Sequence, residues 1–60
     1  MRVIDLVKVL HPVTEIEFFN SLDISMCFCA DIFDIPQDFW HREIEKISTN
    51  EEGTLEILLK

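Results

Sequence analysis

The sequence predicts a small α+β domain in which a short N-terminal helix packs on an antiparallel sheet of about four strands. Three observations lead to this fold class. An apolar stripe at helical spacing opens the chain, alternating apolar and polar residues follow it, and a short glycine-containing loop separates the last two apolar segments. With 60 residues the chain is long enough for one domain only, spanning residues 1–60.

The first ten residues have the spacing of a short amphipathic helix. Apolar residues recur at i, i+3, i+4 and i+7: Val3, Leu6, Val7 and Leu10. Residues at this spacing share one helical face and can pack on a sheet. The helix should end at His11-Pro12, because the residue before a proline avoids the helical region and proline cannot continue the hydrogen-bond ladder.

A strand is predicted over residues 14–18, where apolar and acidic residues alternate. The alternation places Ile16 and Phe18 toward the core and leaves Glu15 and Glu17 in water. Turn-forming residues then lead into a second strand, so the two strands should pair as a hairpin.

The second strand, predicted over residues 24–33, is apolar on both faces. One face carries Ile24, Met26, Phe28, Ala30 and Ile32, and the other carries Ser25, Cys27, Cys29 and Asp31. A strand of this kind lies either in the middle of a covered sheet or at an interface. Because the short helix can cover one face only, the sequence predicts association, with Cys27 and Cys29 as candidate interface residues.

The middle of the chain allows two interpretations. Residues 34–38 contain a proline followed by an acidic residue, which is typical of a helix start. Spacing of i, i+4 and i+7 would extend this helix through three apolar residues: Trp40, Ile44 and Ile47. Alternatively the helix is one or two turns long and residues 43–49 form a third strand. The tight loop at 50–53 precedes an apolar strand at 54–59 and needs a strand on its other side, which favours the short helix.

The charge balance limits the class of partner. Twelve acidic residues against five basic ones give a formal net charge of -7. A surface of this sign repels nucleic acid and anionic membranes and attracts basic protein surfaces. No apolar run approaches the ~20 residues that span a bilayer, and no secretory signal is recognisable, so we expect a cytoplasmic protein with reduced cysteines.

The two cysteines and two histidines raise the question of a metal site. On a strand, Cys27 and Cys29 project from the same face at a separation of ~6.6 Å, near the outer limit for a disulfide. Together with His11 and His41 they could form a zinc site, but their spacing matches no zinc-binding pattern. The favoured interpretation is two small buried residues under a helix or at an interface, with no metal and no cofactor.

No set of residues predicts catalysis. His41 has no nucleophile motif to act on, and it is interpreted as a surface histidine. Asp31, Asp34 and Asp38 lack the loop geometry of a calcium or magnesium site. Capping by Asp34 and compensation of the helix dipole by Asp38 explain two of these three, so the chain is expected not to be an enzyme.

Phe19 and Trp40 are predicted to contact a partner. Phe19 follows Phe18, so the two rings must point to opposite faces of the strand. Exposed aromatic side chains in a small domain are favoured binding anchors. The alternative is a second small cluster formed by Phe19, Trp40 and the short helix.

The glutamates of the strands could form a second binding feature. They are expected on outward positions or in the last loop: Glu15, Glu17, Glu43, Glu45, Glu51, Glu52 and Glu56. Glu15, Glu17 and Glu56 are the candidates for partner contact, because a row of carboxylates can imitate the phosphates of a duplex. The alternative is a solubilising face that prevents aggregation.

Four segments carry a resemblance that extends over nearly the whole chain: residues 1–10, 14–18, 34–36 with 42–44, and 53–57. In these segments the chain resembles short, acidic, mostly uncharacterised proteins encoded by phages, prophages and mobile elements of Gram-positive and gut bacteria. The shared positions are fold-forming, so the resemblance carries over no functional residue. It implies a protein that acts in the bacterial host cell by binding a host or phage machine, as anti-CRISPR proteins do.

Two functions are therefore expected. In the first, the chain is a non-enzymatic accessory protein of a phage or mobile element, binding the basic surface of a nucleic-acid-handling or defence machine as an inhibitor. In the second, it is a self-associating domain that forms a homodimer through its doubly apolar second strand. Neither function requires direct contact with nucleic acid or a membrane.

Overall fold

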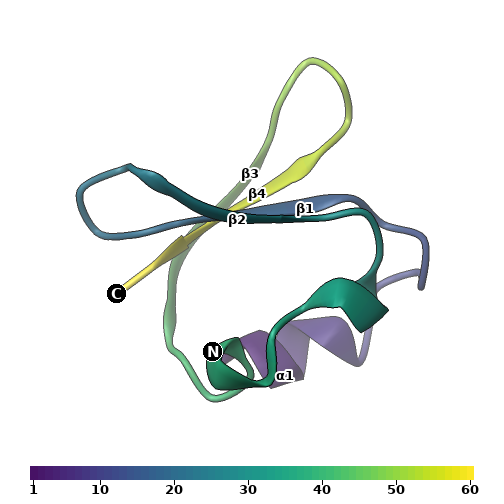
Figure 1. Cartoon of the computed structure of the whole chain (residues 1–60), viewed down its shortest axis with the longest axis horizontal. Helices are drawn as coiled ribbons and strands as arrows, with labels where there is room; N and C mark the ends of the chain where they lie inside the picture. Colours follow the sequence, from purple (N-terminus) through teal and green to yellow (C-terminus); the bar gives the residue numbers. More distant parts are fainter.

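The computed structural model of the chain, which describes residues 1–60, has four strands in a single sheet and short helices along one side of it (Figure 1). The elements in chain order are α1 (Val3–Val7), β1 (Ile16–Phe19), β2 (Ser25–Cys29), η1 (Ile32–Asp34), η2 (Gln37–Phe39), β3 (Ile44–Thr49) and β4 (Leu55–Leu59). Both η1 and η2 are 3-10 helices. The predicted α+β class, with one short N-terminal helix and a sheet, is confirmed.

The sheet is mixed, and the prediction of an antiparallel sheet is wrong for its central pair. Its strand order is β2-β1-β4-β3. The two hairpins, β1 with β2 and β3 with β4, are antiparallel, whereas β1 and β4 are parallel. Each hairpin is set by its own turn, but the direction of one hairpin against the other depends on the connection from β2 to β3. That connection, residues 30–43, crosses from one edge of the sheet to the other and is long enough to join parallel strands.

The core lies between the sheet and the helices. The buried apolar residues are Val3, Leu6, Ile16, Phe18, Cys29, Ile35, Ile44, Ile57 and Leu59. Ile16 and Phe18 are completely buried, as the alternation in the first strand predicts. Phe18 meets Phe39 at the end of η2 edge to face, with ring centroids 5.0 Å apart, which fixes η2 against the sheet. The side of the sheet that carries Phe18 is called the covered face below.

The helix α1 is shorter than predicted because its last turn tightens. The Val9 amide donates to the Leu6 carbonyl at 3.0 Å and the Leu10 amide donates to the Val7 carbonyl at 3.3 Å, as in a 3-10 turn. The apolar stripe still faces the core. Val3 and Leu6 are buried, and Val7 and Leu10 are half-buried against the same cluster.

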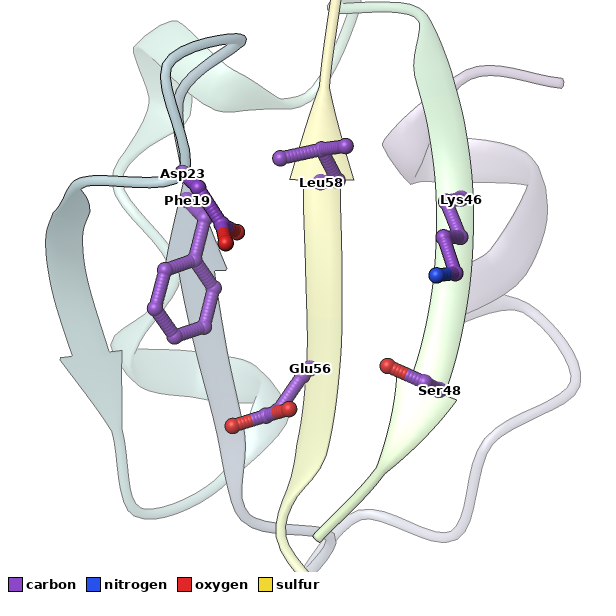
Figure 2. Close-up of a pocket in the computed structure, with 6 residues that line it drawn as sticks. All are labelled: Phe19, Asp23, Lys46, Ser48, Glu56 and Leu58. Atoms are coloured by element: carbon purple, nitrogen blue, oxygen red, sulfur yellow. The ribbon is translucent and has the colours of Figure 1, made fainter.

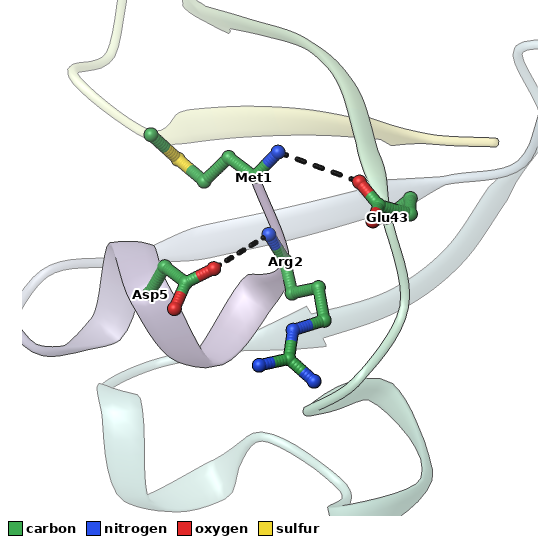
Figure 3. A network of polar contacts seen from close by, with 4 residues as sticks. All are labelled: Met1, Arg2, Asp5 and Glu43. Carbon is green, nitrogen blue, oxygen red and sulfur yellow. Dashed lines mark hydrogen bonds and ion pairs between the residues drawn. The ribbon is translucent and has the colours of Figure 1, made fainter.

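The start of α1 is tied to the beginning of β3 (Figure 3). The Ile44 amide donates to the Met1 carbonyl at 2.8 Å, and the Met1 ammonium group lies 3.4 Å from a carboxylate oxygen of Glu43. The Arg2 amide donates to Asp5 Oδ2 at 3.0 Å, which satisfies one of the free amides at the helix start. This hydrogen bond is the main reason why the pKa of Asp5 lies below its usual value.

The connection between β2 and β3 contains two 3-10 helices in place of one helix starting at Pro36. Ile35 precedes Pro36 and has extended backbone, so η1 and η2 cannot merge. The cap of η1 is Asp31, whose Oδ1 accepts hydrogen bonds from the amides two and three residues on, at 2.9 and 3.1 Å. The prediction of Asp34 as the cap is wrong, because Asp34 lies inside the first turn of η1.

The two hairpin turns are built in the same way. Asn20 begins the first turn and Asn50 the second, and each side-chain oxygen accepts from the amides two and four residues on. The residue three positions on is left-handed in both turns: Asp23 has φ 66° and Gly53 has φ 85°. Glycine adopts this conformation without strain, and aspartate is one of the few other residues that tolerate it.

Candidate functional site: the open face of the sheet

The side of the sheet opposite the helices carries no covering element, and it is called the open face below (Figure 1). Directly opposed residues of neighbouring strands share a face. The register therefore places two rows of side chains on the open face. The first row runs Phe28, Glu17, Glu56 and Ser48, and the second runs Ser25, Phe19, Leu58 and Lys46.

Apolar side chains are exposed on and beside this face. Phe28 on the edge strand β2 is 56% exposed, and its neighbour Met26 is 40% exposed. Phe19 and Leu58, in the middle of the sheet, are half-buried by their neighbours. Large apolar side chains left in water next to one another are a common mark of an interaction surface.

Two carboxylates lie next to each other between these apolar residues. Glu17 and Glu56 are directly opposed in the parallel pair of β1 and β4. The Ser25 hydroxyl donates to Glu17 Oε2 at 2.6 Å, which holds that carboxylate in place. The only ion pair in the chain joins Met1 to Glu43, so Glu56 has no cationic partner.

A hollow of about 390 Å³ lies on the open face (Figure 2). Its lining residues are Phe19, Asp23, Lys46, Ser48, Glu56 and Leu58. Figure 2 shows the Phe19 ring and the Asp23 carboxylate together on one wall, with Lys46 on the opposite wall. The Glu56 carboxylate points toward the Phe19 wall and away from Lys46. The hollow thus has an acidic and aromatic side and a basic side.

Three of the residues predicted to bind a partner come together on this face: Phe19, Glu17 and Glu56. Glu15 lies one residue before β1, where its carboxylate accepts a hydrogen bond from the Thr54 hydroxyl at 3.4 Å. Sequence analysis did not select Lys46, Asp23, Leu58 or Phe28 as site residues.

Trp40 lies on the other side of the sheet from Phe19. It follows η2, which packs on the covered face through Phe39 and Phe18, and its indole nitrogen donates to the Ile35 carbonyl at 3.4 Å. Phe18 and Phe19 are consecutive in β1 and point to opposite faces of the sheet. Trp40 lies on the Phe18 side, so the alternative of a cluster between Phe19 and Trp40 is wrong.

The cysteines belong to the covered face. Cys27 and Cys29 are opposed to Phe18 and Ile16, and their sulfur atoms lie 3.8 Å apart. Cys29 is completely buried, so its assignment to an interface is wrong, and Cys27 is half-buried beside it. Burial, together with the hydrogen bond to Cys27, raises the pKa of the Cys29 thiol to about 12. The exposed apolar residues of β2 are instead Met26 and Phe28.

The histidines are engaged separately. His11 Nδ1 accepts from the Val13 amide at 3.3 Å, and His41 Nδ1 lies 3.4 Å from a guanidinium nitrogen of Arg2. No three side chains of histidine, cysteine, aspartate or glutamate are gathered in a way that could hold a metal ion.

Comparisons with known proteins add no further assignment. No protein-family model, curated protein or solved structure matches the chain. None of its helices has the length and apolar character needed to cross a bilayer.

Proposed function

We propose that the chain is a non-enzymatic protein-binding domain that docks its open face on a basic surface of a partner protein. The observation that carries the proposal is the composition of that face. Aromatic and aliphatic side chains surround two neighbouring carboxylates, and no element of the chain covers them. Apolar side chains supply affinity when they are removed from water, and charges steer the encounter and select the partner.

The sign of the charge supports a basic partner. On and around the open face, Glu17, Glu56 and Asp23 outnumber the single cation, Lys46. The whole chain carries a formal charge of -7, so its long-range field attracts cations over a wide area. The same field opposes binding to the phosphate backbone of nucleic acid.

Within this proposal, the partner is a nucleic-acid-handling or defence protein in the bacterial cytoplasm, and binding inhibits it. Proteins that hold nucleic acid present basic channels, which an acidic domain with an apolar anchor can occupy in place of phosphates. The resemblance to small acidic phage and prophage proteins supports this form of the proposal.

A homodimer through the open face is the second candidate. The exposed Phe28 and Met26 at the sheet edge favour it, because they are apolar enough to bury against a second copy. A homodimer would bring two strongly acidic chains together, however, so the basic partner is the preferred occupant.

The test compares two variants with equal charge change. Tagged protein would be exposed to a bacterial lysate at low and high salt, together with the double variants Glu17→Gln/Glu56→Gln and Glu51→Gln/Glu52→Gln. Glu51 and Glu52 lie in the turn between β3 and β4, outside the paired rows of the open face and the lining of its hollow. We expect a protein with a basic surface to be retained by wild type and by the turn variant, lost at high salt, and lost by the open-face variant.

Equal retention by both double variants would contradict the proposal, because it would show that only total charge matters. A chain that retains nothing and sediments at twice its 7.1 kDa would replace the proposal with the homodimer.

A further inference from the structure

We infer that the hollow on the open face is a socket for one arginine side chain of the partner. This inference rests on the proposed function and adds the chemical group that the open face selects. The hollow of about 390 Å³ lies at the small end of the range for ligand pockets, roughly 300–1,000 Å³. That volume is large enough to admit a single long side chain.

The walls of the hollow match the parts of an arginine side chain. Leu58 and the Phe19 ring offer apolar contact for the stem and a face on which a planar guanidinium can stack. Asp23 and Glu56 are the acceptors. They belong to different elements, the first hairpin turn and β4, yet they line the same hollow.

Both carboxylates are free to accept a cation from outside the chain. The single ion pair of the molecule joins Met1 to Glu43, so neither Asp23 nor Glu56 is neutralised internally. A guanidinium can donate to two carboxylates at once because its five N–H groups form a planar fork. The compact ammonium of lysine cannot stack on the ring while donating in the same way, so arginine is the better fit.

The chain already contains this type of contact elsewhere. On the covered face, the Arg42 guanidinium carbon lies 5.8 Å from the centre of the Phe39 ring, within the range of a cation–π interaction. This is the only cation–π contact within the chain. No arginine of the chain therefore stacks on the Phe19 ring, which lies on the opposite side of the sheet.

The effect of removing the Lys46 charge distinguishes an arginine in the hollow from a homodimer. It lines the wall opposite Phe19 and has no ion-pair partner. A guanidinium in the hollow would be repelled by this ammonium, so Lys46→Gln should strengthen the binding of arginine. In a homodimer through the same face, Lys46 would instead meet carboxylates of the second copy, and its removal would weaken association.

The test is an NMR titration of ¹⁵N-labelled protein with the peptide acetyl-Gly-Arg-Gly-amide. The control peptide carries citrulline, which has the shape of arginine without its charge. We expect saturable shifts at the amides of Phe19, Glu56 and Leu58 with the arginine peptide, and binding weaker by about fivefold with the citrulline peptide, as for a partly exposed ion pair.

Three variants complete the design. Glu56→Gln and Asp23→Asn should each weaken binding of the arginine peptide, and Asp23→Asn preserves the turn because asparagine tolerates the left-handed conformation. Lys46→Gln should strengthen it. Glu51→Gln, which makes the same charge change in the other turn, should leave the affinity within about twofold of wild type.

Equal binding of the two peptides, shifts spread over the whole chain, or an equal loss in Glu51→Gln would overturn the socket. The proposed function is tested by a different experiment. That experiment compares how much partner protein is retained by wild type and by the Glu17→Gln/Glu56→Gln variant. A partner that is retained while the arginine peptide shows no saturable shift would leave the docking face in place and remove only the arginine socket.

Discussion

Asn50→Ala should destabilise the chain much more than Asn20→Ala, although the two side chains make the same hydrogen bonds. Asn50 Oδ1 accepts from two amides at 2.9 and 3.0 Å, and Asn20 Oδ1 does so at the same two distances. The difference lies in the fourth residue after each asparagine. Thr54 is 4% exposed, whereas Ile24 is 57% exposed.

The magnitude follows from what each amide does after the side-chain oxygen is removed. In the first turn both amides can bond to water, so Asn20→Ala loses only the net value of its hydrogen bonds, about 1 kcal/mol in total. In the second turn the Thr54 amide is held at a buried residue and would be left without an acceptor. An unsatisfied buried donor costs about 1–3 kcal/mol, so Asn50→Ala should lower the free energy of unfolding by about 3 kcal/mol.

Urea denaturation and thermal unfolding, both followed by circular dichroism, measure the two changes. A difference of about 2 kcal/mol corresponds to a gap of roughly 8–16 °C in Tm for a domain of this size. Asn50→Asp and Asn20→Asp are the matched controls, since each keeps an acceptor oxygen at the same place. Equal destabilisation by the two alanine variants, or a larger effect at Asn20, would refute the argument from burial.

Four further predictions concern groups whose surroundings are equally well defined. Cys27 should react with a maleimide in the native protein near neutral pH while Cys29 reacts only after unfolding, as mass spectrometry of the labelled peptides would show. The pKa of Cys29 is about 12 in the folded protein and 9.0 ordinarily, so the free energy of unfolding should fall as the pH rises from about 9 toward 12. In urea titrations at alkaline pH, Cys29→Ala should reduce this dependence of the unfolding free energy on pH. Because the pKa of Asp5 in the folded state is below its usual value of 3.8, Asp5 stabilises the fold at pH values above 3.8, and this stability is lost as the pH falls through the folded pKa. Asp5→Asn should therefore make stability less dependent on pH in acid. An unchanged pH dependence would show that the hydrogen bond from the Arg2 amide contributes nothing. Gly53→Ala should lower stability by about 1–2 kcal/mol through its left-handed backbone alone, since no atom beyond the adjacent residues lies within 4 Å of an added Cβ. A neutral result in urea unfolding would contradict this cause.

Local patterns predicted the interior of this fold well. The alternation around Ile16 and Phe18 identified two completely buried residues, and the helical stripe beginning at Val3 identified the face of α1 that packs on the sheet. These successes have the same origin, because a period of two or of 3.6 is imposed by the neighbouring backbone. The stripe remained valid even where the helix itself stopped early, after Val7.

Relations between distant segments were not predictable in the same way. The parallel pairing of β1 with β4 depends on how residues 30–43 cross the sheet, and no residue in either strand encodes that path. For the same reason sequence analysis missed Lys46 and Asp23, which line the hollow only because three strands and a turn bring them together. The second strand, apolar on both faces, predicted association; β2 lies at the edge of the sheet, and the association stays a prediction.

The consecutive residues Phe18 and Phe19 lie on the two different faces of the sheet. Phe18 is completely buried and packs on Phe39, so its ring contributes to the fold. Phe19 is turned to the open face, where it lines a hollow beside the unpaired carboxylate of Glu56. None of the buried core residues lies on the open face. The buried core of the domain and the proposed partner contacts are therefore formed by different side chains.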